Sequence, residues 1–183
     1  MFNYLRKVLL HRSLQRLVEH SKRRRQSFNF ETARSIALLF DASEEETRKI
    51  VAMWAEAFVE REHRKRLHVL AFVDDAHLVG QSRFPQFTAR DLRWYGRIEG
   101  LAVTRFLAQT PDLLLCFNPH QQPTIQWVAA ASKASMKVGS SNTPPHDFDV
   151  VIETPADKDI QFFFRQVAHY LSKIVPAHYE QPA

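Results

Sequence analysis

A continuous apolar run spans residues 36–40 and lacks the 3.6-residue period of a helix. Because the run is short and turn residues flank it, we predict a strand buried on both faces, as in a parallel sheet. Ser43 precedes Glu46 by three residues, which is the spacing of a capping box, so we expect a helix to begin there. An amphipathic stripe follows, made up of Thr47, Ile50, Val51, Trp54 and Phe58.

Apolar runs and helical patterns then alternate along the chain. We expect strands at 67–73, 84–87, 112–117, 136–138 and 148–152, a helical turn at 88–92, and helices at 99–109 and 123–133. A final helix carries Ile160, Phe163, Phe164, Val167, Leu171 and Ile174 on one side. This alternation predicts an α/β fold: a single doubly wound, mostly parallel Rossmann-like sheet with helices on both faces and residues 36–40 at its centre.

The first residues form a separate pattern. We divide the chain into a basic N-terminal helical arm, residues 1–27, and an α/β domain, residues 28–183. From residue 10 onward Leu10, Leu14, Leu17 and Val18 share one helical face, opposite Arg12 and Arg16. The run at residues 22–25 is expected to close this helix.

Composition narrows the class of protein. A length of 183 residues suits one domain. Cys116 is the single cysteine, so an internal disulfide is excluded and a reducing compartment is favoured. No apolar run approaches the roughly 20 residues that span a bilayer. We therefore expect a cytoplasmic protein.

The net charge of +5 conceals an asymmetry between the two parts of the chain. Residues 1–25 contain eight Lys and Arg and one Glu, a net charge of +7, which leaves −2 for the remainder. Such asymmetry indicates an acidic partner, either RNA or an anionic membrane surface. A helix packed on the domain with a solvated basic face is the ordinary alternative.

Arginines and aromatic residues interleave between residues 83 and 97, where Asp91 is the one acid and the net charge is +3. Arginine beside exposed aromatics can stack unpaired bases and contact phosphates. The alternative is that the aromatics fill an edge of the core. The residues predicted to contact RNA are Arg12, Arg16, Lys22, Arg23, Arg24, Arg25, Arg90, Arg93, Trp94, Tyr95 and Arg97.

Ligands of open parallel sheets bind beyond the carboxyl ends of the strands. The residues expected at this edge as a ligand loop are Asp41, Ser43, Asp74, Asp75, Asn118 and His120. Clustered carboxylates can hold magnesium, although aspartates after strands more often begin turns and cap helices. The first turn lacks a glycine-rich phosphate motif. We predict no cofactor and no metal.

Nucleophilic catalysis has little support in the sequence. Cys116 lies in an apolar run and is expected to be a buried packing thiol. The nine histidines form no zinc-binding pattern. We therefore predict no catalytic residue. Phe162 falls off the apolar face of its helix and is a candidate contact with a protein partner.

Several segments resemble a known family: FETARSIALLFDA at 30–42, VLAFVD at 69–74, DLRWYG at 91–96, AAASKA at 129–134, KVG at 137–139 and the final helix. The chain resembles the bacterial domain-of-unknown-function family six-nine-one-three. The resemblance implies a cytoplasmic bacterial protein and no known activity. Residues 112–139 are also similar to the N-terminal, Rossmann-like half of heptosyltransferase-type glycosyltransferases, a likeness that favours the fold more than the activity.

Three functional hypotheses follow. The leading one is a non-enzymatic accessory protein that binds RNA or the ribosome through its basic arm. The second is a glycosyltransferase-like enzyme, or a remnant of one, that acts at the carboxyl ends of the strands. The third is a peripheral membrane protein.

Overall fold

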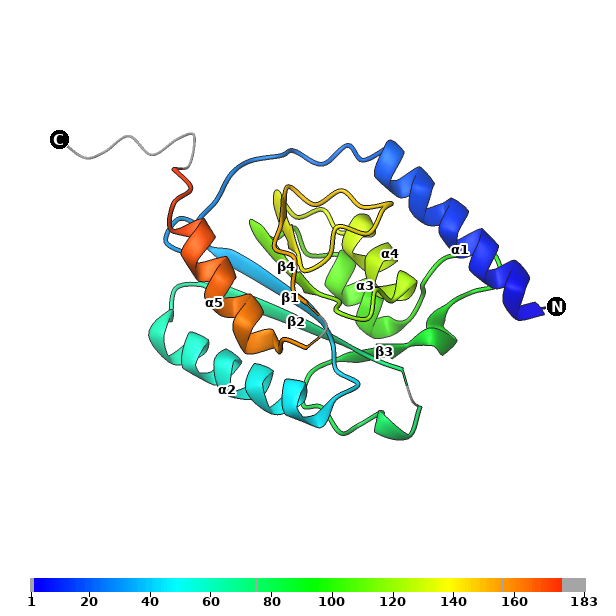
Figure 1. The fold of residues 1–183 in the computed structure, drawn as a ribbon, viewed down its shortest axis with the longest axis horizontal. Helices are drawn as coiled ribbons and strands as arrows, with labels where there is room; N and C mark the ends of the chain where they lie inside the picture. Colours follow the sequence, from blue (N-terminus) through cyan, green and yellow to red (C-terminus); the bar gives the residue numbers. More distant parts are fainter. Residues whose placement is uncertain (1, 75, 156, 176–183) are drawn as a thin grey trace.

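The computed structural model describes residues 2–74, 76–155 and 157–175. Within these ranges six strands form one sheet in the order β3-β2-β1-β4-β5-β6, and every neighbouring pair is parallel (Figure 1). The strands are β1 (Ser35–Asp41), β2 (Arg66–Val73), β3 (Gln86–Thr88), β4 (Leu113–Phe117), β5 (Met136–Gly139) and β6 (Val150–Val151). The predicted α/β fold with a mostly parallel sheet is confirmed.

Helices cover both faces of the sheet. They are α1 (Phe2–Glu19), α2 (Glu45–Arg61), α3 (Leu101–Leu107), α4 (Pro123–Ala131) and α5 (Ile160–Leu171), with 3-10 turns at Ala76–Leu78 and Ala89–Asp91. Helices α2 and α5 pack on one face, and α1, α3 and α4 lie on the other (Figure 1). The sheet is therefore doubly wound, as predicted.

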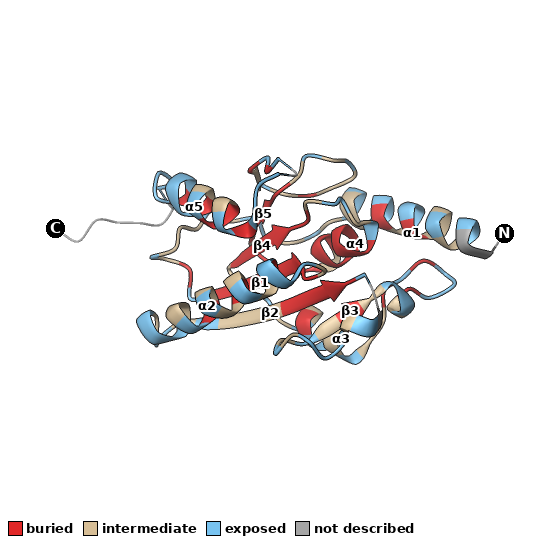
Figure 2. Ribbon diagram, turned by 60° about the horizontal axis from the view of Figure 1, so that its bottom comes forward, coloured by how far each residue is buried: buried red, intermediate tan, exposed pale blue. Residues whose placement is uncertain are grey.

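Strand β1 lies inside the sheet and is buried along its whole length (Figure 2). Ile36, Leu38 and Phe40 belong to the core under α2 and α5, whereas Ala37 and Leu39 belong to the core under α3 and α4. Side chains alternate between the faces of a strand, so a continuous apolar run is what a strand between two cores requires.

Two predicted local features are wrong. The capping box at Ser43 does not form: the N-cap of α2 is Glu44, and the Ser43 hydroxyl instead donates to Asp41 Oδ1 at 2.6 Å. Asp41 is buried, and a buried carboxylate needs hydrogen-bond donors. Residues 22–25 do not close α1, which ends at Glu19.

The expected strand at 148–152 shortens to the two residues of β6. The Asp149 carboxylate immediately before β6 is drawn toward the neighbouring strand, where it accepts from the Lys137 backbone N–H at 2.8 Å. Side-chain bonds of this kind compete with regular strand pairing.

Helix α1 is packed against the domain. Leu10 and Leu14 are buried in the core that contains α4, and Trp127 Nε1 donates to Ser13 Oγ at 2.9 Å. Gly96 adopts φ +81°, and a Cβ there would collide with the backbone of Leu9. Glycine therefore permits both the conformation of this turn and its close approach to α1.

Because Leu114 is fully buried in β4, we expect Leu114→Ala to lower the free energy of unfolding by about 2–5 kcal/mol through the cavity that it leaves. Urea denaturation measures this change. Leu101→Ala, at an exposed position, is the control and should cost little. A loss below about 1 kcal/mol for Leu114→Ala would contradict the central place of β4.

Candidate nucleic-acid interface

A groove lies where α1 passes the turn at residues 93–97. Its volume is about 1110 Å³, and its lining consists of Leu9, Arg12, Ser13, Arg16, Leu17, His20, Tyr95, Arg97 and Trp127. Three of these residues are arginines and none is acidic. The structure thus brings part of the basic arm together with part of the arginine-aromatic segment.

The turn that carries Tyr95 and Arg97 is anchored at its base. Leu92 and Ile98 form an antiparallel bridge and are both buried. Arg93 N–H donates to Arg97 O at 2.8 Å, which closes the turn. Arg6 on α1 donates to Leu92 O at 2.9 Å. The turn and the helix therefore hold their positions relative to each other.

The aromatic residues of this turn face solvent and do not fill an edge of the core. Trp94 is 68% exposed, Tyr95 is 39% exposed, and their rings meet edge to face with centroids 5.3 Å apart. A hydrogen bond to Glu99 raises the pKa of Tyr95, and burial adds to this effect. Glu99 also lies 3.6 Å from Arg93 and partly offsets its charge. Exposed rings beside Arg97 are available for stacking.

Several of the other residues predicted to contact RNA lie away from the groove. Lys22 and Arg24 are exposed on the extended segment after α1. Arg25 is also exposed and forms a long ion pair with Asp149 at 3.6 Å. Arg90 is exposed but lines a different hollow, together with Ser43 and other residues at the carboxyl ends of β1 and β2. These four residues do not line the groove.

Arg23 was predicted to contact phosphate, but the structure places its guanidinium in a buried ion network and not on an exposed basic surface. Its side chain is 3% exposed, and its guanidinium lies 3.2 Å from Asp147 Oδ2 and 2.7 Å from Asp149 Oδ2. It also donates to Ser135 O at 2.8 Å. The sequence shows a run of cations at this point, but the two aspartates that neutralise this arginine come more than 100 residues later in the chain.

A second cation, Lys137, pairs with the same Asp147 carboxylate as Arg23, and it was not predicted from the sequence. Lys137 is fully buried in β5, and its Nζ lies 2.8 Å from Asp147 Oδ2 and 3.1 Å from Ala130 O. Burial lowers the pKa of Lys137 to about 8, although Asp147 acts in the opposite direction. A lysine inside an otherwise apolar strand was the available signal, since buried lysines are paired.

The carboxyl ends of β1 and β4 bring Asp41 and His120 together. His120 Nδ1 lies 3.1 Å from Asp41 Oδ2, while Asp41 Oδ1 accepts from Ser43. The strand order reverses between β1 and β4, which is the position where ligands of such sheets bind. His120 is 49% exposed at the side chain, so an Asp-oriented imidazole reaches solvent at this edge of the sheet.

The remaining residues of the predicted ligand loop have structural roles or lie apart. Asn118 is buried and exchanges two hydrogen bonds with the backbone of Gln122, at 2.8 Å and 3.1 Å. Asp74 is exposed, and its backbone N–H donates to Ser43 Oγ at 3.3 Å. Asp75 falls outside the described residues.

Cys116 is fully buried in β4, and burial raises the pKa of its thiol to about 12. The prediction of a packing thiol is confirmed. Phe162 is half-buried on α5. Over residues 2–74, 76–155 and 157–175, no group of three His, Cys, Asp or Glu side chains is placed to hold a metal ion. No helix within those ranges has the length and apolar character needed to cross a membrane.

Comparison with known proteins places this architecture in a family. The family of unknown function DUF6913 has a model that matches residues 6–174. The chain belongs to this family. No curated protein and no solved structure matches the chain, so the local similarity to heptosyltransferases finds no support there.

We expect Arg23→Ala to destabilise the protein by about 2–4 kcal/mol, because it removes one member of a buried ion network. Arg24→Ala is the matched control, since the adjacent side chain is exposed and its loss should change stability by less than about 0.5 kcal/mol. Chemical denaturation of both variants measures the difference. Equal stability would show that Arg23 is a solvated cation.

The low pKa of Lys137 predicts a pH dependence of stability. Between its folded pKa of about 8 and the ordinary value of 10.5, the unfolded chain binds more protons than the folded protein. The free energy of unfolding should therefore rise with pH, by on the order of 1–3 kcal/mol, as pH passes through this interval. Denaturation of wild type and Lys137→Met across the interval isolates this contribution. A stability difference between the two that does not vary with pH would contradict it.

Proposed function

We propose that this protein is a non-enzymatic accessory factor of the bacterial cytoplasm that binds single-stranded RNA, with the ribosome as the candidate particle. The groove between α1 and the turn at residues 93–97 carries the proposal. It gathers Arg12, Arg16 and Arg97 beside Tyr95, and none of the described residues that line it is acidic.

The chemistry of these side chains suits unpaired RNA. Arginine guanidinium groups bind phosphate oxygens through paired hydrogen bonds. Arg12 and Arg16 lie one helical turn apart, about 6 Å along α1, and so offer cations along a line. Trp94 and Tyr95 offer ring faces on which bases stack without regard to sequence. The arginines of the groove thus lie beside a stacking surface made by Tyr95, which lines the groove, and by Trp94, which adjoins Tyr95 outside it.

A salt titration tests the electrostatic part of the proposal. The combined substitution of Arg12, Arg16 and Arg97 by alanine should flatten the slope of log K against log salt by about two units, at roughly 0.7 per phosphate contact. Fluorescence anisotropy with a labelled single-stranded RNA measures K. The control replaces three exposed cations on the opposite face, Arg61, Arg165 and Lys173, and should leave the slope unchanged.

The aromatic residues provide a second arm of the same experiment. Trp94→Ala should weaken binding by about 1–3 kcal/mol, the contribution of one stacked base, while leaving the salt slope intact. Absence of RNA binding by the wild type, or an unchanged slope in the groove variant, would reject the proposal. Flotation with anionic liposomes separates a membrane-surface role from RNA binding.

The Asp41–His120 pair favours a second candidate function, acid–base chemistry at the carboxyl ends of the strands. A carboxylate that holds an imidazole in one orientation is a frequent arrangement in general-base catalysis. Thermal-shift screening with nucleotide sugars tests this candidate. Stabilisation that is lost in His120→Gln and kept in the groove variant would favour an enzyme over an RNA-binding factor.

A further inference from the structure

The outer edge of β2 is covered over less than half its length. β3 pairs with β2 only from Ala71 to Val73, and the first bond of this ladder runs from Ala71 N–H to Pro85 O at 2.9 Å. Pro85 has no N–H, so β3 cannot extend the ladder toward the start of β2. The first half of β2 is consequently an open sheet edge.

The open edge presents main-chain groups at strand spacing. Arg66 N–H and Phe72 C=O bond toward β1, at 2.9 Å and 2.7 Å, so the alternate residues Leu67 and Val69 direct their N–H and C=O groups outward. Among the described residues nothing hydrogen-bonds to these four groups. Unpaired edges of this kind pair readily with another extended chain.

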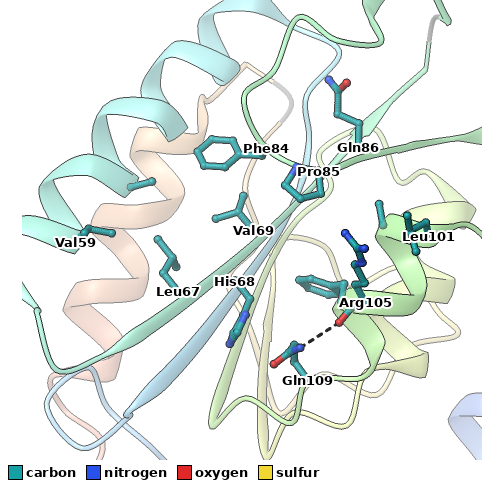
Figure 3. A pocket seen from close by; sticks show the side chains of 13 residues that line it. Val59, Leu67, His68, Val69, Phe84, Pro85, Gln86, Leu101, Arg105 and Gln109 are labelled. Carbon is teal, nitrogen blue, oxygen red and sulfur yellow. Dashed lines mark hydrogen bonds between the residues drawn. The ribbon is translucent and has the colours of Figure 1, made fainter.

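A groove of about 730 Å³ runs along this edge and has two different walls (Figure 3). The wall on the α2 side is apolar and contains Val59, Leu67 and Phe84. The wall on the α3 side contains Leu101 and Arg105. Val59 is 59% exposed and Leu101 is 68% exposed, so both rims present apolar surface to solvent.

We propose that an extended segment of a partner protein docks here by adding a strand to β2. Only an extended chain can pair with the groups of both Leu67 and Val69 while sending side chains alternately to the two walls. The partner's side chains that point toward Val59 are apolar. The partner's side chains toward Arg105 are acidic, because no acidic residue in the described part of the chain lines the groove to neutralise this arginine.

A second copy of this chain fits the groove less well. Pairing two β2 edges around a two-fold axis would place the basic walls of the two copies, each with Arg105, in one shared interface. Like charges placed opposite each other disfavour association. The open edge is also short, since β3 occupies the remainder.

The probe is a short capped peptide in which valine and glutamate alternate, titrated against the full chain and followed by calorimetry and amide chemical shifts. Two further peptides carry N-methyl groups on one or the other alternate set of residues. Strand addition uses the amides of one set only, so one methylated peptide should lose binding and the other should keep it. Shifts should centre on Leu67 and Val69.

Substitutions in the protein locate the binding site without relying on the N-methylated peptides. Val59→Asp and Arg105→Glu should each weaken binding at least about tenfold, because one disrupts the apolar wall and the other repels the glutamates. Met53→Asp, an exposed apolar position elsewhere on α2, and Arg165→Glu on α5 are matched controls. All four positions are exposed, so the fold should survive.

Several outcomes would overturn the proposal. They are no binding of the unmethylated peptide at about 1 mM, equal effects of the two methylation patterns, and unchanged affinity in Val59→Asp. Sedimentation supplies a further one: self-association of the wild type that Val59→Asp abolishes would assign the groove to a second copy. RNA binding is measured on the same variants and should be unaffected, so the two proposals fail separately.

Discussion

The fold depends on covering β1 on both of its faces. A strand with apolar side chains on each side cannot leave either face in water, so helices must cover both. Helices α2 and α5 complete one core, while α3 and α4 complete the other with the help of α1. The N-terminal helix is thereby part of the hydrophobic interior, and its basic side is held next to the turn at residues 93–97.

The ion network around Asp147 fixes the path of the chain between α1 and β1. Arg23 and Lys137 both contact this aspartate, so a strand in the sheet and a segment before the sheet share one buried carboxylate. Burying charges is costly unless each one is paired and hydrogen-bonded, which explains why backbone carbonyls also accept from both cations. The basic run at residues 22–25 therefore combines one structural arginine with solvated neighbours.

Features written into short stretches of sequence were predictable, and features made by distant partners were not. The apolar run of β1 and the stripe of α2 follow from local periodicity. The capping role of Ser43 failed because Asp41, two residues earlier, competes for its hydroxyl. The burial of Arg23 and the open edge of β2 depend on chain segments that the topology brings together. The placement of Asp41 and His120 at one edge of the sheet did follow from the predicted strands, although their direct contact did not. The periodicity of a short stretch carries no information about tertiary contacts with distant segments.

Gly96 shows that the proposed RNA footprint is a steric property as much as an electrostatic one. The missing side chain lets the turn sit against the backbone of Leu9, and this contact sets the separation between Arg97 and the arginines of α1. A larger residue would push the helix and the turn apart. A protein of identical charge could then lack the surface, so net charge alone is a poor guide to which related chains share this groove.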